Sequence, residues 1–251
     1  GLEGRRRAGR PVRGVQVSAW KPKRFWKLAV AEAYDGGFTV RLDGKAVRTP
    51  AKAAFVLPTM AMARAAAAEW DAQDKEVRPE TMPVTRAANS AIDKLGHQFA
   101  EVVDLLAEYG DSDLLCYRAE GPEGLVARQT AAWDPLLAWA KGELGVSLRA
   151  TAGVMHIAQP PEALARLRAE LAAASRFELA ALHDLIAITG SLILGLAVAR
   201  GHLSAAEAFS KSRIDEQWQA ELWGADDEAA QSEAAKAAAL DEAARFHALC
   251  R

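Results

Sequence analysis

The sequence lacks the short motifs that identify the common nucleotide-dependent and hydrolytic enzymes. It contains no Walker loop, no Gly-x-Gly-x-x-Gly, no His-Glu-x-x-His, no Gly-x-Ser-x-Gly and no Cys-x-x-Cys. Its five histidines stand at least nineteen residues apart. His183 and Asp184 are the nearest approach to a catalytic pair, but adjacent helical residues point about 100° apart, so we expect them not to face one site. We therefore expect no catalytic residues and no cofactor.

Cysteine is also scarce. Cys116 and Cys250 lie far apart, without metal-binding or redox spacing, so we expect two free thiols in a reducing compartment. The apolar neighbours of Cys116 predict a raised thiol pKa and a structural role. The longest apolar run, residues 185–199, is shorter than the roughly 20 residues that a membrane span needs, so we expect a buried core helix.

Charge of one sign is concentrated only at the start of the chain. The net charge is −2, but residues 1–27 carry nine Lys or Arg and a single acid, Glu3. We expect residues 1–19 to form a disordered or non-native tail; a remnant of a mitochondrial presequence and a nucleic-acid-binding arm are the alternatives. Because only this tail favours nucleic acid, we expect no nucleic-acid partner. Since the tail is not a convincing presequence, we expect a location in the bacterial cytoplasm, or in the mitochondrial matrix if the source is eukaryotic.

What the sequence does contain is a change of period near residue 58. Before it, short apolar runs separated by Gly- and Pro-rich turns predict a β-meander with strands at residues 25–33, 38–42, 46–49 and 54–57. In the second run, alternation places Phe38, Val40 and Leu42 on a buried face and Thr39 and Arg41 on a solvated one.

From residue 59 onward the pattern is helical to the end. Thr59 predicts the N-cap of the first helix, and a helical stretch at 85–109 is interrupted near Gly96. Asp134-Pro135 predicts the start of a new helix, and Pro161 predicts the start of another. Ser175 and Glu178 predict a capping box for one long apolar helix that ends at Gly201. A final helix is predicted at 226–249. With 51% apolar residues the chain can bury a large core. We predict an α+β fold: a small antiparallel β domain at 20–58 followed by a larger all-helical domain at 59–251.

The stretch from Ser204 to Gly224 combines unusual features. Ser204 and Glu207 form a capping-box pattern and Gly224 a helix stop, which predicts one helix of about five turns. Ile214, Trp218 and Leu222 form a stripe that we expect to dock into the body of the protein. Asp215, Gln219 and Trp223 form the adjoining stripe.

That second stripe, with Glu216, places carboxylates, an amide and an indole on the flank of the docked face. Asp215 and Glu216 diverge on a helix, which is poor geometry for shared acid–base chemistry. An interaction patch fits better, since Trp supplies buried area and carboxylates select a basic partner surface. A solvated helix flank with Trp223 under the C-cap is the structural alternative. Trp70 is most simply a core anchor of the first helix.

A metal-dependent helical hydrolase or transferase is the alternative function. Asp111-Ser112-Asp113 resembles a two-carboxylate element for a divalent ion, which prefers oxygen ligands. The structural interpretation is that Gly110 ends one helix and Asp111 or Asp113 caps the next segment, and it leads us to expect no metal site.

Several segments together resemble one known family. In chain order they are RFWK (24–27), LDGKAVRTP (42–50), AEWDAQ (68–73), MPVT (82–85), YGDSDLLCYR (109–118), QTAAWDPLLAW (129–139) and SRIDEQWQAELWG (212–224). The order and content are similar to the assembly chaperones that handle the alpha subunit of the F-type ATP synthase, the Atp-twelve family. The resemblance covers roughly residues 20–250.

The resemblance implies a monomeric, non-enzymatic chaperone that binds the free alpha subunit and covers its beta-facing surface until the beta subunit displaces it. It also implies the same two-part fold. The sensitive acidic segment of the family falls here on Asp215, Glu216, Gln219, Trp223 and Gly224, and its E-W-D tryptophan falls on Trp70. Many members carry a His-Asp pair beyond Trp-Gly where this chain has Ala230-Gln231, so the predicted site ends at Gly224.

Overall fold

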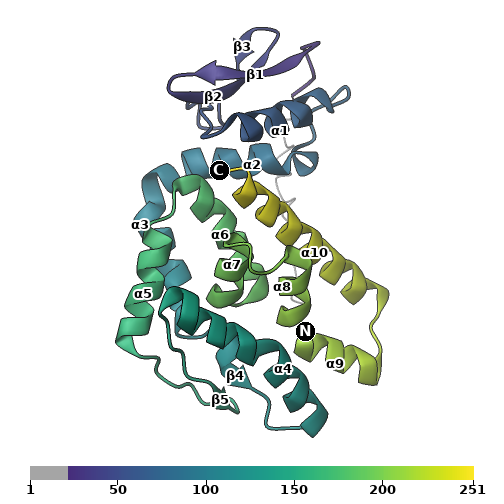
Figure 1. The fold of residues 1–251 in the computed structure, drawn as a ribbon. Helices are drawn as coiled ribbons and strands as arrows, with labels where there is room; N and C mark the ends of the chain where they lie inside the picture. The colour runs from purple at the N-terminus through teal and green to yellow at the C-terminus, as the bar shows by residue number, and fades with distance from the viewer. Residues whose placement is uncertain (1–21) are drawn as a thin grey trace, which may run out of the picture.

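The computed structural model of the chain describes residues 22–251, so the expectations for the tail at 1–19 lie outside the described residues. The predicted α+β class is confirmed. A small antiparallel sheet lies at one end of the molecule and helices build the rest, as Figure 1 shows. The division into domains at residue 58 stays a prediction.

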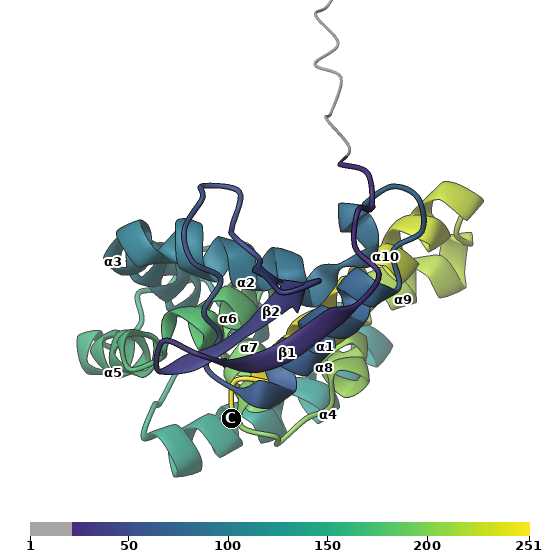
Figure 2. The same ribbon diagram turned by 90° about the horizontal axis from the view of Figure 1, so that it is seen from above.

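The sheet has the strand order β1-β2-β3, with β1 at Ala29–Tyr34, β2 at Gly37–Leu42 and β3 at Lys45–Ala46. β1 pairs with β2 in the register Ala29↔Leu42 to Tyr34↔Gly37. Helix α1 (Met60–Asp71) lies under the sheet (Figures 1 and 2), and the Thr59 side chain caps its first turn by accepting from the Met62 amide, as predicted.

Three strand predictions are wrong in detail. The first strand begins at Ala29, and the third covers Lys45–Ala46 rather than residues 46–49. Residues 54–57 form only isolated bridges to Phe38 and Arg48. Because residues 54–57 cover that side of β2, Thr39 is buried rather than solvated, and its hydroxyl donates to the Phe55 carbonyl at 2.5 Å.

The sheet and the first helices share one apolar cluster. It joins β1 and β2 to α1 and α2 (Pro83–Asp93), and Phe177 of α6 (Arg176–Thr189) and Phe246 of α10 (Asp227–Ala248) extend it into the helical body. A 3₁₀ turn, η1 (Pro79–Thr81), lies between α1 and α2. The chain then turns at Lys94 into α3 (Leu95–Ala107), as the predicted interruption near Gly96 requires.

A second apolar cluster fills the larger helical part. The short turns η2 (Glu108–Gly110) and η3 (Leu114–Cys116) lead into β4 (Tyr117–Arg118), which pairs in parallel with β5 (Thr151–Ala152). Helix α4 runs without a break from Glu123 to Trp139 and contains Pro135, so the predicted helix start at Asp134-Pro135 is wrong. The carboxylate of Asp134 pairs with Arg118 at 2.8 Å instead of capping a helix. The π-type turn η4 (Ala140–Leu144) ends this helix, and α5 (Pro161–Ala172) begins at its predicted proline.

The centre of the bundle is formed by two helices where one was predicted. α6 (Arg176–Thr189) begins with the predicted Ser175–Glu178 capping box but stops at Gly190, which is left-handed (φ 68°). Ser191 then caps α7 (Leu192–Ala199), whose side chains are almost all buried.

The Ser204–Gly224 stretch is likewise divided. α8 (Ala205–Ser212) carries the predicted capping box, but Arg213 leaves the helical region (φ −112°, ψ 23°) and α9 (Ile214–Trp223) starts in a new direction. α10 (Asp227–Ala248) closes the chain with Asp226 as N-cap. Within residues 22–251, no helix has the length and apolar character needed to cross a membrane.

Candidate protein-binding site

Helix α9 lies at the edge of the molecule, in the half away from the sheet, where Figure 1 places it beside α4 and connected to the start of α10. It contains no buried residue. Ile214 and Trp218 are partly buried, as the predicted docking stripe requires, but Leu222 is 57% exposed, so the prediction is wrong for the last turn. The docked face is therefore only the first half of the helix.

The contact with α4 holds α9 in place. The ring of Trp218 lies over Gly124, where an added Cβ would stand 2.9 Å from the ring, and the Arg128 guanidinium lies 4.8 Å from its centre. Arg128 also donates to both oxygens of Glu221 at 2.9 and 2.8 Å. This pairing raises the pKa of Arg128 and lowers that of Glu221. Glycine at 124 thus permits the close approach that seats the indole.

A buried amide fixes the orientation of Asp215. Gln129 of α4, 1% exposed, donates from Nε2 to Asp215 Oδ1 at 2.5 Å and accepts from the Ala119 amide at 2.8 Å. One carboxylate of the predicted patch is therefore oriented by the protein interior.

Arg213 explains why the structure has two helices, α8 and α9, where the sequence predicted one. Its side chain is buried, donates from Nε to Glu233 Oε2 at 2.8 Å and contacts the Ile188 carbonyl at 3.2 Å. The guanidinium also lies 4.8 Å from the centre of the Phe209 ring. Burying this charge requires partners on α6 and α10 together, and reaching them bends the backbone between α8 and α9.

An open groove of about 950 Å³ lies between α9 and α10. Asp215, Glu216, Gln219, Trp223 and Gly224, all predicted as site residues, line this one surface. Trp223 is 81% exposed, which is opposite to the alternative in which it lies under the C-cap. A large indole left in solvent at the mouth of a groove is the kind of feature that marks a contact site.

The groove is lined by more acidic than basic side chains. Arg213 and Lys236 are its basic residues, and both pair with Glu233. The remaining lining carboxylates are Asp215, Glu216 and Asp226, and none of them forms an ion pair with the described residues. The groove therefore favours a basic occupant.

Gly224 sets the angle between the two helices. Its backbone (φ 78°, ψ 169°) lies in a region that only glycine occupies readily, and no atom lies within 4 Å of where a Cβ would stand. The glycine is required by the backbone and not by crowding.

Trp70, the remaining predicted site residue, lies elsewhere. It ends α1 at the sheet end of the molecule, where its half-buried ring meets Trp26 edge-on with centroids 5.3 Å apart. Figure 1 places α1 and α9 at opposite ends. The structure therefore brings together the α9 residues and leaves Trp70 in a separate aromatic cluster.

The two carboxylates of the alternative metal site serve different partners. Asp113 is fully buried and accepts from the Leu115 and Ile193 amides, both at 3.0 Å, which joins η3 to the start of α7. Burial nevertheless raises its pKa to about 6. Asp111 lies near His156 and accepts from the Gln159 amide. No group of three or more metal-ligating side chains gathers within the part of the chain that the structure describes.

Two further sequence expectations have clear outcomes. Cys116 is buried and desolvation raises its pKa to about 12, as expected. His183 and Asp184, expected to diverge, do contact each other: Nδ1 and Oδ1 are 3.0 Å apart. Both side chains are exposed, so the contact is a surface pair.

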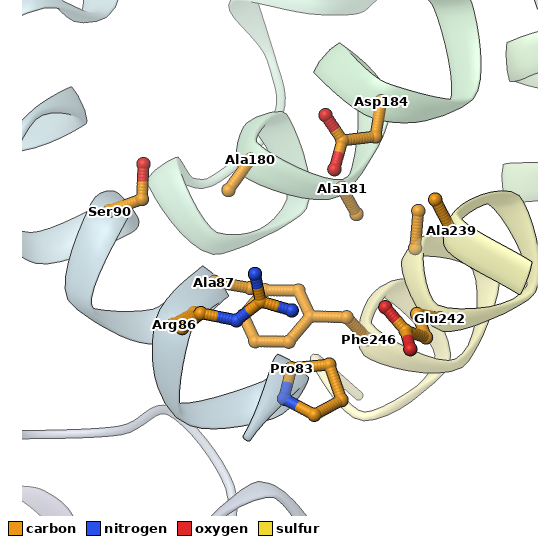
Figure 3. Close-up of a pocket in the computed structure, with 11 residues that line it drawn as sticks. Pro83, Arg86, Ala87, Ser90, Ala180, Ala181, Asp184, Ala239, Glu242 and Phe246 are labelled. Atoms are coloured by element: carbon orange, nitrogen blue, oxygen red, sulfur yellow. The ribbon is translucent and has the colours of Figure 1, made fainter. Parts of the chain in front are cut away.

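A smaller hollow of about 280 Å³ lies where α2, α6 and α10 meet. Figure 3 shows Arg86 of α2 and Glu242 of α10 extending beside the Phe246 ring, with alanines behind them. Its described lining includes neither histidine nor cysteine.

Sequence reasoning missed the residues that hold α9. Gln129, Arg128 and Gly124 are on α4, about ninety positions before their partners, and no local pattern links them. Arg213 gave no local signal either, since Lys211, Asp215 and Glu216 are charged residues in the same helical pattern.

The chain is similar to known proteins in sequence and in structure. The family model described as ATP12 chaperone protein matches residues 23–141. The crystal structure of Atp12 from Paracoccus denitrificans is 48% identical, covers 91% of this chain and 98% of its own, and superposes with a TM-score of 0.89. A protein structure from Agrobacterium tumefaciens is 43% identical over 92% of this chain and 87% of its own, with a TM-score of 0.88. The mitochondrial protein atp12 of Schizosaccharomyces pombe is 28% identical over 220 residues, which are 82% of this chain and 75% of the yeast protein.

Proposed function

The chain belongs to the ATP12 chaperone family, and on that premise we propose that it binds the free alpha subunit of the F-type ATP synthase during assembly of the catalytic head. In this proposal the chaperone shields the beta-facing surface of the alpha subunit until the beta subunit displaces it. The resemblance found in the sequence supports membership of this family. What we propose beyond it is which protein the chaperone binds and how it acts.

The observation that carries the proposal is the surface of α9. An 81% exposed Trp223 stands over a groove whose lining carboxylates, Asp215, Glu216 and Asp226, lack ion-pair partners among the described residues. Such a surface suits an apolar and basic segment of another protein: the indole supplies contact area and the carboxylates reject acidic partners.

Shielding of this kind requires no reaction. A free subunit that exposes an apolar face needs a partner that buries it, and release follows when the beta subunit buries more of the same face. We therefore propose that the protein is not an enzyme, uses no cofactor and acts as a monomer. Its relatives in a bacterium and in yeast mitochondria support the bacterial cytoplasm, or the mitochondrial matrix in a eukaryote, as the place of action.

Charge reversal at Glu216 tests the site. The Glu216 side chain is exposed and has no hydrogen bond or ion pair with any residue in 22–251, so we expect Glu216→Lys to leave the fold intact. We expect binding of the purified alpha subunit, measured by isothermal calorimetry, to weaken by about 1 kcal/mol or more. Asp241→Lys is the matched control, since Asp241 is exposed on α10 but outside the groove. Equal affinity of both variants for the alpha subunit would count against the α9 groove as the binding site.

A further inference from the structure

The outer side of β1 has no partner strand. The Asp43 amide donates to the Leu28 carbonyl at 3.0 Å, and bonded and non-bonded pairs alternate along antiparallel strands. The backbone groups of Ala31 and Ala33 therefore point away from β2. Within residues 22–251, neither residue's N–H or C=O has a hydrogen-bond partner on that side.

The start of this edge is covered, because Asp71 Oδ1 accepts from the outward-pointing Ala29 amide at 2.8 Å. Beyond Ala29, nothing within β1 blunts the edge. The strand AVAEAY has six residues without proline or lysine. Its one charged residue, Glu32, forms an ion pair with Arg41 on the neighbouring strand. Edge strands of soluble proteins are usually protected by charge, proline or a covering segment, because an open edge pairs with other chains. An unprotected edge is therefore expected to have a use.

Exposed apolar side chains lie beside the edge. Phe25 is 66% exposed, Leu28 57% and Val30 42%. Leu28 and Val30 are two residues apart and so project from the same face of the sheet. This group is separate from the exposed pair on α9, which lies at the other end of the molecule (Figure 1).

Two lysines lie near the start of β1: Lys27 precedes the strand, and Lys45 belongs to β3, on the other side of β2. Lys27 and Lys45 are exposed, and neither has a carboxylate within 4.0 Å among the described residues. The Lys45 ammonium lies 5.9 Å from the centre of the Phe25 ring. The nearby carboxylate of Asp43 is occupied by the amides of Lys27 and Leu28, whose hydrogen bonds lower its pKa.

We propose that β1 takes up an extended segment of a partner protein by strand addition, and that this segment alternates apolar with acidic side chains. The edge amides and carbonyls of Ala31 and Ala33 supply the main-chain hydrogen bonds, Leu28 and Val30 contact the apolar positions, and Lys27 and Lys45 attract the acidic ones. A second copy of this chain is a poorer occupant, since it would bring a second Lys27 and Lys45 to one sheet.

The aromatic cluster beneath supports a surface completed by a partner. Trp26, 4% exposed, contacts Phe25 and Trp70 edge-on with centroids 5.1 and 5.3 Å apart. The indole N–H groups of Trp26 and Trp70 are buried and have no hydrogen-bond partner in the described chain. Buried donors are normally satisfied, so two buried indole donors without an acceptor are unusual.

The test uses two labelled peptides with the intact protein: one alternates valine and glutamate, the other valine and lysine. We expect fluorescence anisotropy to detect binding of the glutamate peptide only. In NMR hydrogen exchange, the glutamate peptide should protect the amides of Ala31 and Ala33.

Two variants separate the parts of the proposal. Ala33 is exposed, so Ala33→Pro removes one edge donor at a position where an edge strand tolerates proline, and Ala33→Ser keeps the donor as its control. We expect Ala33→Pro to weaken peptide binding about tenfold, or about 1.4 kcal/mol, and Ala33→Ser to leave it unchanged. Lys27→Glu with Lys45→Glu should weaken it similarly, while Arg64→Glu on α1 should not.

Several results would overturn the proposal. Binding of neither peptide, or of both equally, removes the acidic partner segment. Undiminished binding by Ala33→Pro removes strand addition. A concentration-dependent dimer in sedimentation that Ala33→Pro dissolves assigns the edge to a second copy instead. None of these outcomes bears on the α9 groove, whose residues are unchanged in every variant.

Discussion

Truncation of Trp223 gives the sharpest test of how the α9 groove works. An indole buries about 150–250 Å² on contact, and Trp223 has 81% of its surface available. At about 25 cal/mol per Å², covering that surface corresponds to about 3–5 kcal/mol. Ordering costs and the contact that alanine retains reduce this, so we expect Trp223→Ala to weaken client binding by about 2–4 kcal/mol, or about 30-fold or more.

The same exposure predicts almost no effect on folding. A side chain that is mostly in solvent contributes little to the free energy of unfolding, so urea denaturation of Trp223→Ala should match the unchanged protein within about 0.5 kcal/mol. Binding to the purified alpha subunit is measured by calorimetry in parallel. Leu105→Ala is the control, because Leu105 is an apolar side chain on α3 that is 51% exposed and lies outside the groove.

Two results would refute the reasoning. If Trp223→Ala and Leu105→Ala bind the alpha subunit equally well, exposure of the indole is not what makes the groove a binding surface. If Trp223→Ala loses several kcal/mol of folding stability, the indole serves the fold of the chaperone and its loss of binding carries no information about the site.

Three further predictions concern the framework of the site. Gly224→Ala should lower the free energy of unfolding by about 1–3 kcal/mol through backbone strain alone, measured by urea titration, since no atom crowds the position; an unchanged midpoint would show that the turn adapts. Gly124→Ala should displace the Trp218 ring. We expect the loss in free energy of client binding, measured by calorimetry, to exceed the loss in free energy of unfolding derived from the melting temperature; a larger loss in the free energy of unfolding would show that this contact mainly stabilises the fold. The pKa of Asp113 is raised from 3.8 to about 6 on folding, so the folded state binds more protons than the unfolded state in that window and stability should fall as pH rises through it. Asp113→Asn should lose that slope in urea titrations across pH, and retention of the slope would assign it to another group.

The sequence predicted the fold class and those helix starts that rest on local chemistry. The hydroxyl caps at Thr59, Ser175 and Ser204 and the proline at 161 act within one turn of their own helix, so their effects are readable from neighbouring residues. The helix breaks were harder. Arg213 bends the chain because its buried guanidinium finds partners on α6 and α10, which no local pattern contains.

Two other errors have the same cause. Pro135 looked like a helix start from its neighbours, yet its preceding Asp134 is drawn to Arg118 on β4 and the helix continues through it. Thr39 looked solvated from alternation, but residues 54–57 fold over it. In each case a contact between distant parts of the chain outweighed the local preference.

The residue types of the candidate site could be predicted from the sequence, but the residues that hold α9 in place could not. Asp215, Gln219 and Trp223 lie on one stripe, which helical spacing alone reveals. That Gln129 orients Asp215 from below, and that Trp70 lies at the opposite end, depend on how α4 and α1 pack.

The attachment of α9 to α4 has a consequence for the affinity of capture. The ion pair of Arg128 with Glu221, the seated ring of Trp218 and the buried Gln129 hold the helix before any client arrives. A preorganised arm loses little conformational entropy on association, so more of the contact energy remains as affinity. Weakening the attachment of α9 to α4 would lower the affinity of the proposed complex without removing an atom from the proposed binding surface.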